Sequence, residues 1–247
     1  MVLSSVRRVL MLVVAVAASG MLLTACLKNN VDNNNNQTPV AALMGFNLAP
    51  DQPAVAITLS GNGLSQSPLA YTNYTGAYQN IYTGTRTVQS FNTQAGNSPV
   101  ASTDFNFEAN KYYSVFLVGY NSHYRQVISE DEFDSLSGSQ GNAYIRYINA
   151  IADSAATPAV TIAAGGNNVV SENASFASVS GFRAVTPGSV NIAVKSGTAI
   201  DTSRAISVEQ NKVYTVLLVG VPGATDATQR VQVKFIENGT LAGSNGG

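Results

Sequence analysis

The sequence is poor in charged residues, cysteine and histidine. Its 247 residues include one cysteine, one histidine and no tryptophan, and 11% are charged, whereas an average soluble domain has about 25%. A single cysteine excludes an intramolecular disulfide and a cysteine-based metal site. The basic residues are scattered and the formal net charge is −1, so the chain has no basic stripe to neutralise a nucleic acid.

Uncharged polar side chains take the place of the missing charges. Asn, Gln, Ser and Thr are abundant, together with 21 glycines and many valines and isoleucines. Such a composition is typical of exported all-β proteins, because β-branched residues favour strands. We therefore expect little helix.

The first 25 residues have the features of a secretory signal. Two arginines at positions 7 and 8 precede an apolar stretch over 9–18, and the sequence Leu-Thr-Ala-Cys occupies 23–26. These four residues resemble the lipobox of bacterial lipoproteins, in which the cysteine thiol takes a diacylglyceryl group and a peptidase cuts before it. The resemblance implies cleavage between Ala25 and Cys26, and lipidation of Cys26. A transmembrane anchor is the alternative, but Ser19, Gly20 and Thr24 interrupt the apolar run.

Residues 26–39 form an Asn-rich stretch with too little apolar surface to fold, which predicts a flexible tether. The residue after the cysteine is Leu27, which resembles the pattern of lipoproteins that are passed to the outer membrane. Lipoproteins that are retained in the inner membrane have Asp at this position. We expect an exported protein that is lipid-anchored in the cell envelope, with the outer membrane favoured and the periplasmic or surface side open.

The chain contains an internal repeat of about one hundred residues. The segment NKYYSVFLVG at 110–119 reappears as NKVYTVLLVG at 211–220. Further pairs follow in the same order: 46–57 with 148–153 and 158–162, 76–78 with 181–182, and 84–88 with 188–192. A unit of this length is an independent domain, so two tandem domains follow.

Each copy has several short Val-, Ile-, Tyr- and Thr-rich runs, such as 54–59, 85–91 and 112–118, separated by Gly, Asn, Pro and Ser. This pattern predicts a β-sandwich. The run 113–118 is almost continuously apolar, as expected of a central strand covered by the opposite sheet and by its neighbours. The expected divisions are a signal peptide at 1–25, the tether at 26–39, repeat 1 at 40–134, a linker at 135–141, repeat 2 at 142–238 and a flexible tail at 239–247.

These segments resemble the bacterial family catalogued as domain of unknown function 4397. The likeness rests on the opening NLAPDQPAV at 47–55, the strands GTRTV at 84–88 and KYYSVFLVG at 111–119, and the acidic exit into AYIRYIN at 143–149. Repeat 2 departs at its opening, where 151–157 replaces the compact Pro-Asp turn. The resemblance implies two immunoglobulin-like sandwiches on a secreted or surface protein, and it assigns no catalytic residue or cofactor.

Candidate catalytic groups are scarce. The chain has no Gly-Xaa-Ser-Xaa-Gly elbow, and its one histidine, His123, is expected in an exposed hairpin loop. One histidine is also a poor start for a zinc site. The acidic segment 130–134 is read as a solvated linker, with a calcium site as the alternative. We expect no enzyme, cofactor or metal; a pocket joining His123 to two carboxylates would favour an enzyme.

Four tyrosines gather in the first copy, at positions 71, 74, 78 and 82. Tyr74 and Tyr78 correspond to apolar residues of the second copy and are expected in the core. Tyr71 and Tyr82 are candidate ligand contacts, because exposed tyrosines offer flat amphipathic faces to sugars or peptides.

Ser135 and Ser154 lie in Asp-Ser-Leu and Asp-Ser-Ala, which resemble a short O-glycosylation motif of exported bacterial proteins. The sequence as a whole favours a non-catalytic lipoprotein that acts as a structural, adhesive or assembly module. The alternative is a carbohydrate- or peptide-binding lipoprotein that supports nutrient uptake. Its expected partners are the membrane, through Cys26, and a glycan or protein of the cell envelope.

Overall fold

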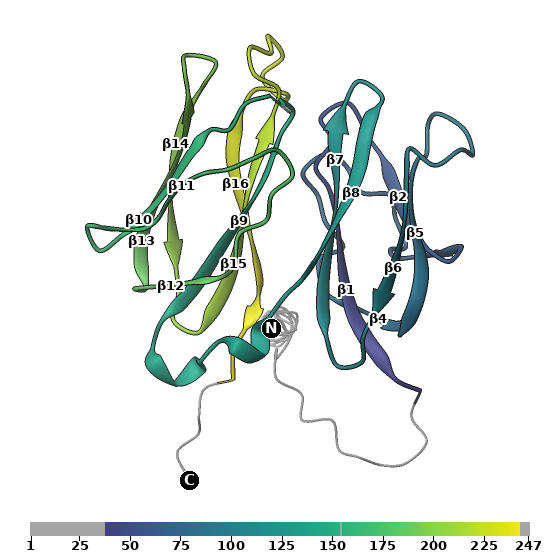
Figure 1. Ribbon diagram of the computed structural model, residues 1–247, viewed down its shortest axis with the longest axis horizontal. Coiled ribbons are helices and arrows are strands. Elements are labelled where there is room, and N and C mark those ends of the chain that lie inside the picture. The colour runs from purple at the N-terminus through teal and green to yellow at the C-terminus, as the bar shows by residue number, and fades with distance from the viewer. Residues whose placement is uncertain (1–37, 154, 243–247) are drawn as a thin grey trace, which may run out of the picture.

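The computed structural model describes residues 38–153 and 155–242, which form two β-sandwich domains placed side by side (Figure 1). The strands of domain 1 are β1 (Val40–Asn47), β2 (Val55–Leu59), β3 (Asn62–Gly63), β4 (Gln79–Tyr82), β5 (Gly84–Asn92), β6 (Ala101–Phe107), β7 (Tyr112–Tyr120) and β8 (His123–Glu130). The strands of domain 2 are β9 (Ala143–Ile151), β10 (Ala159–Ala164), β11 (Asn167–Asn173), β12 (Arg183–Val185), β13 (Gly188–Ser196), β14 (Ile200–Val208), β15 (Lys212–Gly220) and β16 (Gln232–Thr240). Two 3-10 helices, η1 (Phe133–Ser135) and η2 (Gly138–Gln140), lie in the connection between the domains.

The two domains share one topology. In domain 1 the sheet β4-β1-β7-β8 packs on the sheet β3-β2-β5-β6, and in domain 2 the sheet β12-β9-β15-β16 packs on β11-β10-β13-β14. The first strand of each domain pairs in parallel, β1 with β7 and β9 with β15, while the other pairings are antiparallel. The prediction of two tandem immunoglobulin-like sandwiches is confirmed.

Period-two patterning explains the outer strands. In β2, Val55, Ile57 and Leu59 are buried, and the intervening residues are half-exposed. Alternate side chains of a strand point to opposite faces of a sheet, so three side chains enter the sandwich core and two face outward. The other predicted strands of domain 1 are also present, with bounds shifted by one or two residues.

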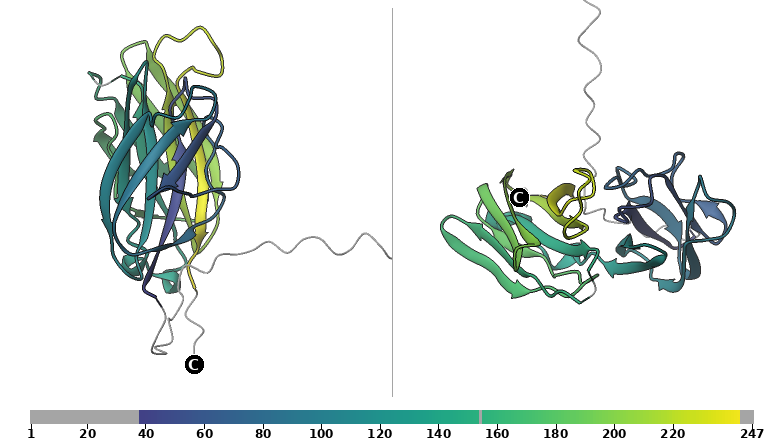
Figure 2. Two further views of the ribbon diagram at one scale, coloured as in Figure 1. Left: turned by 90° about the vertical axis from the view of Figure 1, so that its right-hand side faces the viewer. Right: turned by 90° about the horizontal axis from the view of Figure 1, so that it is seen from above.

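The strands β7 and β15 do not alternate, because the domains stack sheet against sheet. Val115 and Leu117 belong to the core of domain 1, whereas Phe116 and Val118 belong to a cluster shared with domain 2. The molecule therefore has four layers of sheet, and the view from above shows the two domains side by side (Figure 2, right). The sequence predicts that residues 113–118 are covered on both faces by their own domain. One face is covered instead by domain 2.

The second domain is longer than the sequence suggested. β16 continues to Thr240, which pairs with Lys212, and Leu241 is buried. The expected tail at 239–247 is corrected accordingly, because residues 239–241 belong to the sandwich. None of the described helices has the length and apolar character needed to cross a bilayer.

Candidate functional site: the interface between the domains

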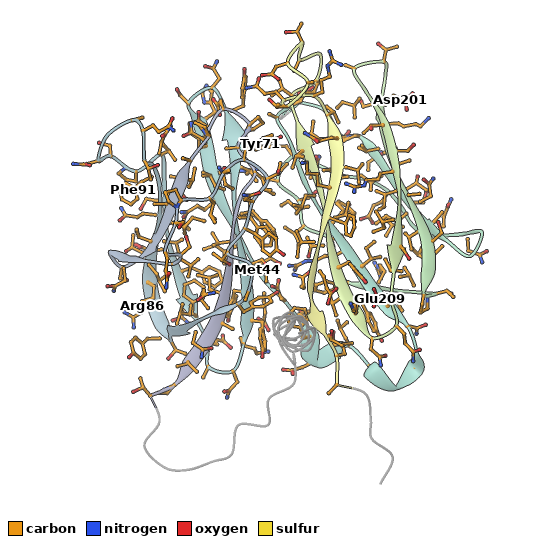
Figure 3. The ribbon with its side chains drawn as sticks, turned by 180° about the vertical axis from the view of Figure 1, so that it is seen from behind. Met44, Tyr71, Arg86, Phe91, Asp201 and Glu209 are labelled. Atoms are coloured by element: carbon orange, nitrogen blue, oxygen red, sulfur yellow. The ribbon has the colours of Figure 1, made fainter. Side chains whose placement is uncertain are left out.

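The two domains meet through corresponding faces of their inner sheets. Figure 3 places Met44 and Tyr71 on the side of domain 1 that faces domain 2, with Arg86 and Phe91 on the far side. By register and repeat, the corresponding positions of the two faces are Met44 and Arg146, Phe46 and Ile148, Ser114 and Thr215, Phe116 and Leu217, and Val118 and Val219. Most of these side chains are fully buried and apolar, so the interface resembles a protein core.

A buried ion pair lies at one end of this apolar interface. Nη1 of Arg146, on β9, is 2.5 Å from Oδ1 of Asp131, which follows β8, and both side chains are at most 1% exposed. The guanidinium also lies over the ring of Phe182, 4.5 Å from its centroid. Removing two charges from water is costly unless each is paired and hydrogen-bonded, so the remaining donors and acceptors matter.

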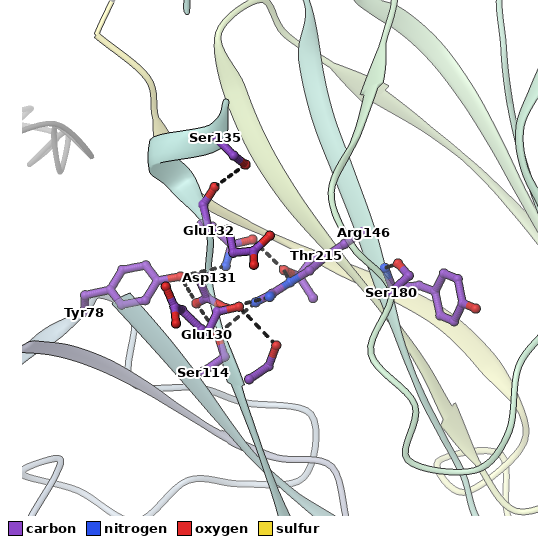
Figure 4. A network of polar contacts seen from close by, with 12 residues as sticks. Tyr78, Ser114, Glu130, Asp131, Glu132, Ser135, Arg146, Ser180 and Thr215 are labelled. Atoms are coloured by element: carbon purple, nitrogen blue, oxygen red, sulfur yellow. Dashed lines mark hydrogen bonds and ion pairs between the residues drawn. The ribbon is translucent and has the colours of Figure 1, made fainter. Parts of the chain in front are cut away.

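Hydrogen bonds around the pair form a closed network (Figure 4). Asp131 Oδ2 accepts from the hydroxyls of Ser114, at 2.7 Å, and Tyr78, at 2.5 Å. Arg146 donates to Ser114 Oγ at 3.0 Å and to Thr215 Oγ1 at 3.1 Å. Thr215 in turn donates to Oδ1 of Asn238 at 2.6 Å, whose amide donates to the Tyr78 hydroxyl at 3.2 Å. Both domains contribute donors and acceptors, so the network ties one domain to the other.

Aromatic packing fixes the acidic segment that supplies Asp131. Phe133 is buried, with its ring 5.7 Å from that of Tyr78 and 5.6 Å from that of Phe182. Burial, and then the charge of Asp131, raise the pKa of Tyr78 well above its usual range. The prediction that 130–134 is a solvated linker is therefore wrong at Asp131 and Phe133, although Glu132 and Asp134 are exposed.

One signal in the sequence could have indicated this network. Arg146 is the one charged residue in the fully buried strand Ala143–Ile151, at the position where the first copy has Met44. An arginine is seldom fully buried unless it is paired, so this replacement predicts a buried acid. The position of that acid, in the segment between the domains, could not be read from strand patterning.

The candidate ligand contacts Tyr71 and Tyr82 do not lie together. Tyr82 pairs with Val40 at the start of β1, whereas the turn holding Tyr71 bonds to Asn47 at the end of β1. Tyr82 is 61% exposed, as expected. Tyr71 instead packs against the interface cluster with a buried hydroxyl, which corrects the expectation of an exposed side chain.

The other two tyrosines of the group also pack at the interface. Tyr74 stacks on Phe46, with ring centroids 5.5 Å apart, and Tyr78 belongs to the polar network. The sequence predicts both in a sandwich core, but both pack against the outer face of the inner sheet. Three of the four tyrosines thus serve the contact between domains.

Removing the hydroxyl of Tyr71 and removing that of Tyr78 are expected to have different effects on the free energy of unfolding. Tyr71→Phe removes a buried hydroxyl that has no hydrogen-bonding partner among the described residues, so we expect the free energy of unfolding to stay unchanged or rise by about 1 kcal/mol. Tyr78→Phe removes a hydrogen bond to a buried carboxylate and is expected to lower it by about 1.5–3 kcal/mol. Urea denaturation of both variants measures the contrast, and equal effects would contradict it.

The remaining predicted site residues are scattered. Ser135 is exposed, and its hydroxyl donates to the carbonyl oxygen of Glu132 at 2.7 Å, so its glycosylation stays a prediction. Ala25, Cys26 and Ser154 lie outside the described residues.

His123 is exposed at the start of β8, as predicted. It lines a hollow of about 480 Å³ between the domains, together with Tyr124, Arg125, Ser175 and Phe176. None of these lining residues is a carboxylate, so the arrangement that would favour an enzyme is not formed there. The described residues also contain no group of three or more His, Cys, Asp or Glu placed to hold a metal ion.

Comparisons with known proteins identify the repeat. A family model described as a domain of unknown function (DUF4397) matches residues 41–156 and again residues 143–242. Among solved structures, one similar chain is a Bacteroides eggerthii protein provisionally assigned to cell adhesion, 14% identical, with 85% of this chain and 99% of that chain covered. Its TM-score is 0.26, which supports no inference about function. No curated protein matches the chain.

Proposed function

Because the chain belongs to the family of the domain of unknown function 4397 and carries two copies of that domain, we propose that it is a non-catalytic structural, adhesive or assembly module of the cell envelope. The observation that carries this proposal is the buried network around Asp131 and Arg146. It joins the two sandwiches into one body, as a spacer or docking module requires, and leaves its own charges paired within the protein.

The residues shared by the two copies support the same proposal, because they stabilise the fold. The Asn47 amide donates to the carbonyl of Leu69 at 3.0 Å, and the Asn149 amide donates to that of Ala174 at 2.9 Å. Each asparagine also accepts a backbone N–H two residues further along the chain. The repeated Asn110 and Asn211 both have φ of 62°, a left-handed conformation that asparagine tolerates at turns.

The attachment to a membrane is part of the proposal and rests on the sequence at 23–26. Lipid on Cys26 would hold the domains through the tether at 26–39, and two or more acyl chains give stable anchoring. The outer membrane is the favoured location, with the domains on its periplasmic or external side.

Cys26→Ser is expected to move the protein from the membrane fraction to the soluble or culture fraction, because the serine hydroxyl cannot accept the thioether-linked lipid. Cell fractionation followed by immunoblotting measures this shift. Ser135→Ala, outside the lipobox, is the control and should stay in the membrane fraction. A Cys26→Ser protein that remained on the membrane would overturn lipid anchoring. If cells with the released Cys26→Ser protein kept a normal cell envelope, the module would not need membrane attachment to act.

A second candidate function is carbohydrate or peptide binding that supports uptake. It is favoured by Tyr82, which is 61% exposed and has the guanidinium of Arg86 5.9 Å from its ring centroid. An exposed aromatic ring beside a cation offers both a stacking face and hydrogen-bond donors. Binding assays of the Tyr82→Ala variant test this surface.

A further inference from the structure

Domain 1 contains a hollow that is separate from the network between the domains. Its volume is about 630 Å³, within the range of roughly 300–1,000 Å³ found for small-molecule sites. The loop at 63–69 forms one wall, and Asn73, Tyr74, Thr75 and Gln79 complete it. The chain between β3 and β4 thus builds most of the hollow.

The hollow exists because the edge strand is interrupted in domain 1. β3 has two residues, Asn62 and Gly63, and the chain then leaves the sheet until Leu69 bridges Val55. The corresponding strand of domain 2, β11, runs for seven residues along β10. The departing loop is therefore a feature of the first copy that the shared fold does not require.

One substitution between the copies makes room for this loop. Gly45 on β1 corresponds to Tyr147 on β9, whose side chain is buried and whose hydroxyl donates to Glu172 of β11 at 2.6 Å. A Cβ atom on Gly45 would lie 2.9 Å from Cδ2 of Leu64, which is too close for an undisturbed contact. Leu64 is part of the core of domain 1 and occupies the space that a side chain at position 45 would enter.

The lining has the chemistry of a site for uncharged, hydroxyl-rich ligands. Gln66, Asn73 and Gln79 carry amides that both donate and accept hydrogen bonds, and none of the lining side chains is charged. Tyr74 supplies an aromatic ring held in place by its stacking on Phe46, with the ring planes 17° apart. Burial, and then the charge of Glu237, raise the pKa of Tyr74.

We propose that this hollow binds a neutral saccharide, with a sugar ring against Tyr74 and its hydroxyls bonded to the surrounding amides. An anionic or phosphorylated ligand would lose hydration without meeting a cation in the lining. This inference deepens the second candidate function: it rests on ligand binding by domain 1 but moves the site from Tyr82 to the hollow.

The full-length protein, purified in detergent, is applied to an array of immobilised neutral hexose and pentose oligosaccharides, with uronic-acid and phosphorylated saccharides on the same array. Titration calorimetry then measures the affinity for the neutral oligosaccharide that gives the highest signal. We expect binding to neutral members, and a loss of at least tenfold in affinity for Tyr74→Ala and for Gln66→Ala. Gln66 is exposed on the loop, so its variant keeps the fold even if removing the Tyr74 ring disturbs Phe46.

Gln94→Ala is the matched control for Gln66→Ala, because it removes an exposed glutamine of the same domain outside the hollow. Its affinity should stay within twofold of the unaltered protein. Loss of binding in Tyr82→Ala with normal binding in Gln66→Ala would overturn the hollow as the site and leave the second candidate function standing. Binding to acidic saccharides alone, or to none on the array, would overturn the proposed ligand class.

Discussion

Replacing Arg146 with alanine is expected to lower the free energy of unfolding by about 3–5 kcal/mol, because it leaves Asp131 buried without its cation. The variant also loses hydrogen bonds to Ser114 and Thr215 and the contact with the Phe182 ring. Urea denaturation, with circular dichroism and size-exclusion chromatography, measures the loss and shows whether the domains separate.

Lys195→Ala is the matched control for this variant. Its ion pair with Asp201 is exposed, with the two side chains 64% and 58% accessible, so its loss should cost less than about 1 kcal/mol. The double change Arg146→Met with Asp131→Asn restores the residue type of Met44 and removes both charges. We expect it to be more stable than Arg146→Ala. If Arg146→Ala unfolded at the same urea concentration as Lys195→Ala, the network would not join the domains.

Gly119→Ala is expected to lower the free energy of unfolding by about 3 kcal/mol or more, because its φ of 124° excludes a side chain and a Cβ would collide with the carbonyl oxygen of His123. Gly119 lies opposite Tyr124 in the hairpin that joins β7 to β8. Backbone atoms form the obstacle, so no side-chain rotation can relieve it.

Gly61→Ala separates the clash from the effect of φ alone. Gly61 also has a positive φ, of 84°, but nothing lies within 4 Å of a Cβ placed there. We expect a loss of about 1–2 kcal/mol for this control, measured by the same urea denaturation. Equal losses in the two variants would show that the contact with His123 does not decide the effect. Gly220, the counterpart of Gly119, meets the carbonyl oxygen of Arg230 in the same way.

The sequence predicts the two domains well because the signals for them are local and repeated. Asn110 and Gly119 recur as Asn211 and Gly220, and the structure shows why: each asparagine has a left-handed φ, and each glycine lies where a Cβ would strike a backbone carbonyl. The alternation of buried residues in strands such as β2 can likewise be inferred from the alternating apolar residues of the sequence. These constraints act within a few residues, so one chain is enough to infer them.

The contact between the domains could not be predicted in the same way. The continuous apolar run around Phe116 indicates burial on both faces, but it does not say which surface covers the second face. Asp131 stands among acidic neighbours that are exposed, and only its position opposite Arg146 distinguishes it. Tyr71, Tyr74 and Tyr78 present a related problem, because their exposure depends on how domain 2 is placed.

The interface is built like that of a symmetric dimer, since the same face of each copy is used. Arg146 in place of Met44 removes the equivalence. A face with methionine meets a face with arginine, and an acid from the connecting segment completes the pair. This difference favours contact between unlike copies, because two arginine-bearing faces would place like charges in one buried region.

The shared face also has a consequence for the order in which the two domains are synthesised and folded. Everything that covers Phe46 and Phe116 from outside domain 1 comes from residues after 140, which leave the ribosome, and cross a membrane if exported, later than the strands they protect. Until β9 and β15 are in place, a folded domain 1 presents an apolar sheet face to its surroundings. Such a surface attracts other chains, so association with other molecules is favoured in the interval before domain 2 folds.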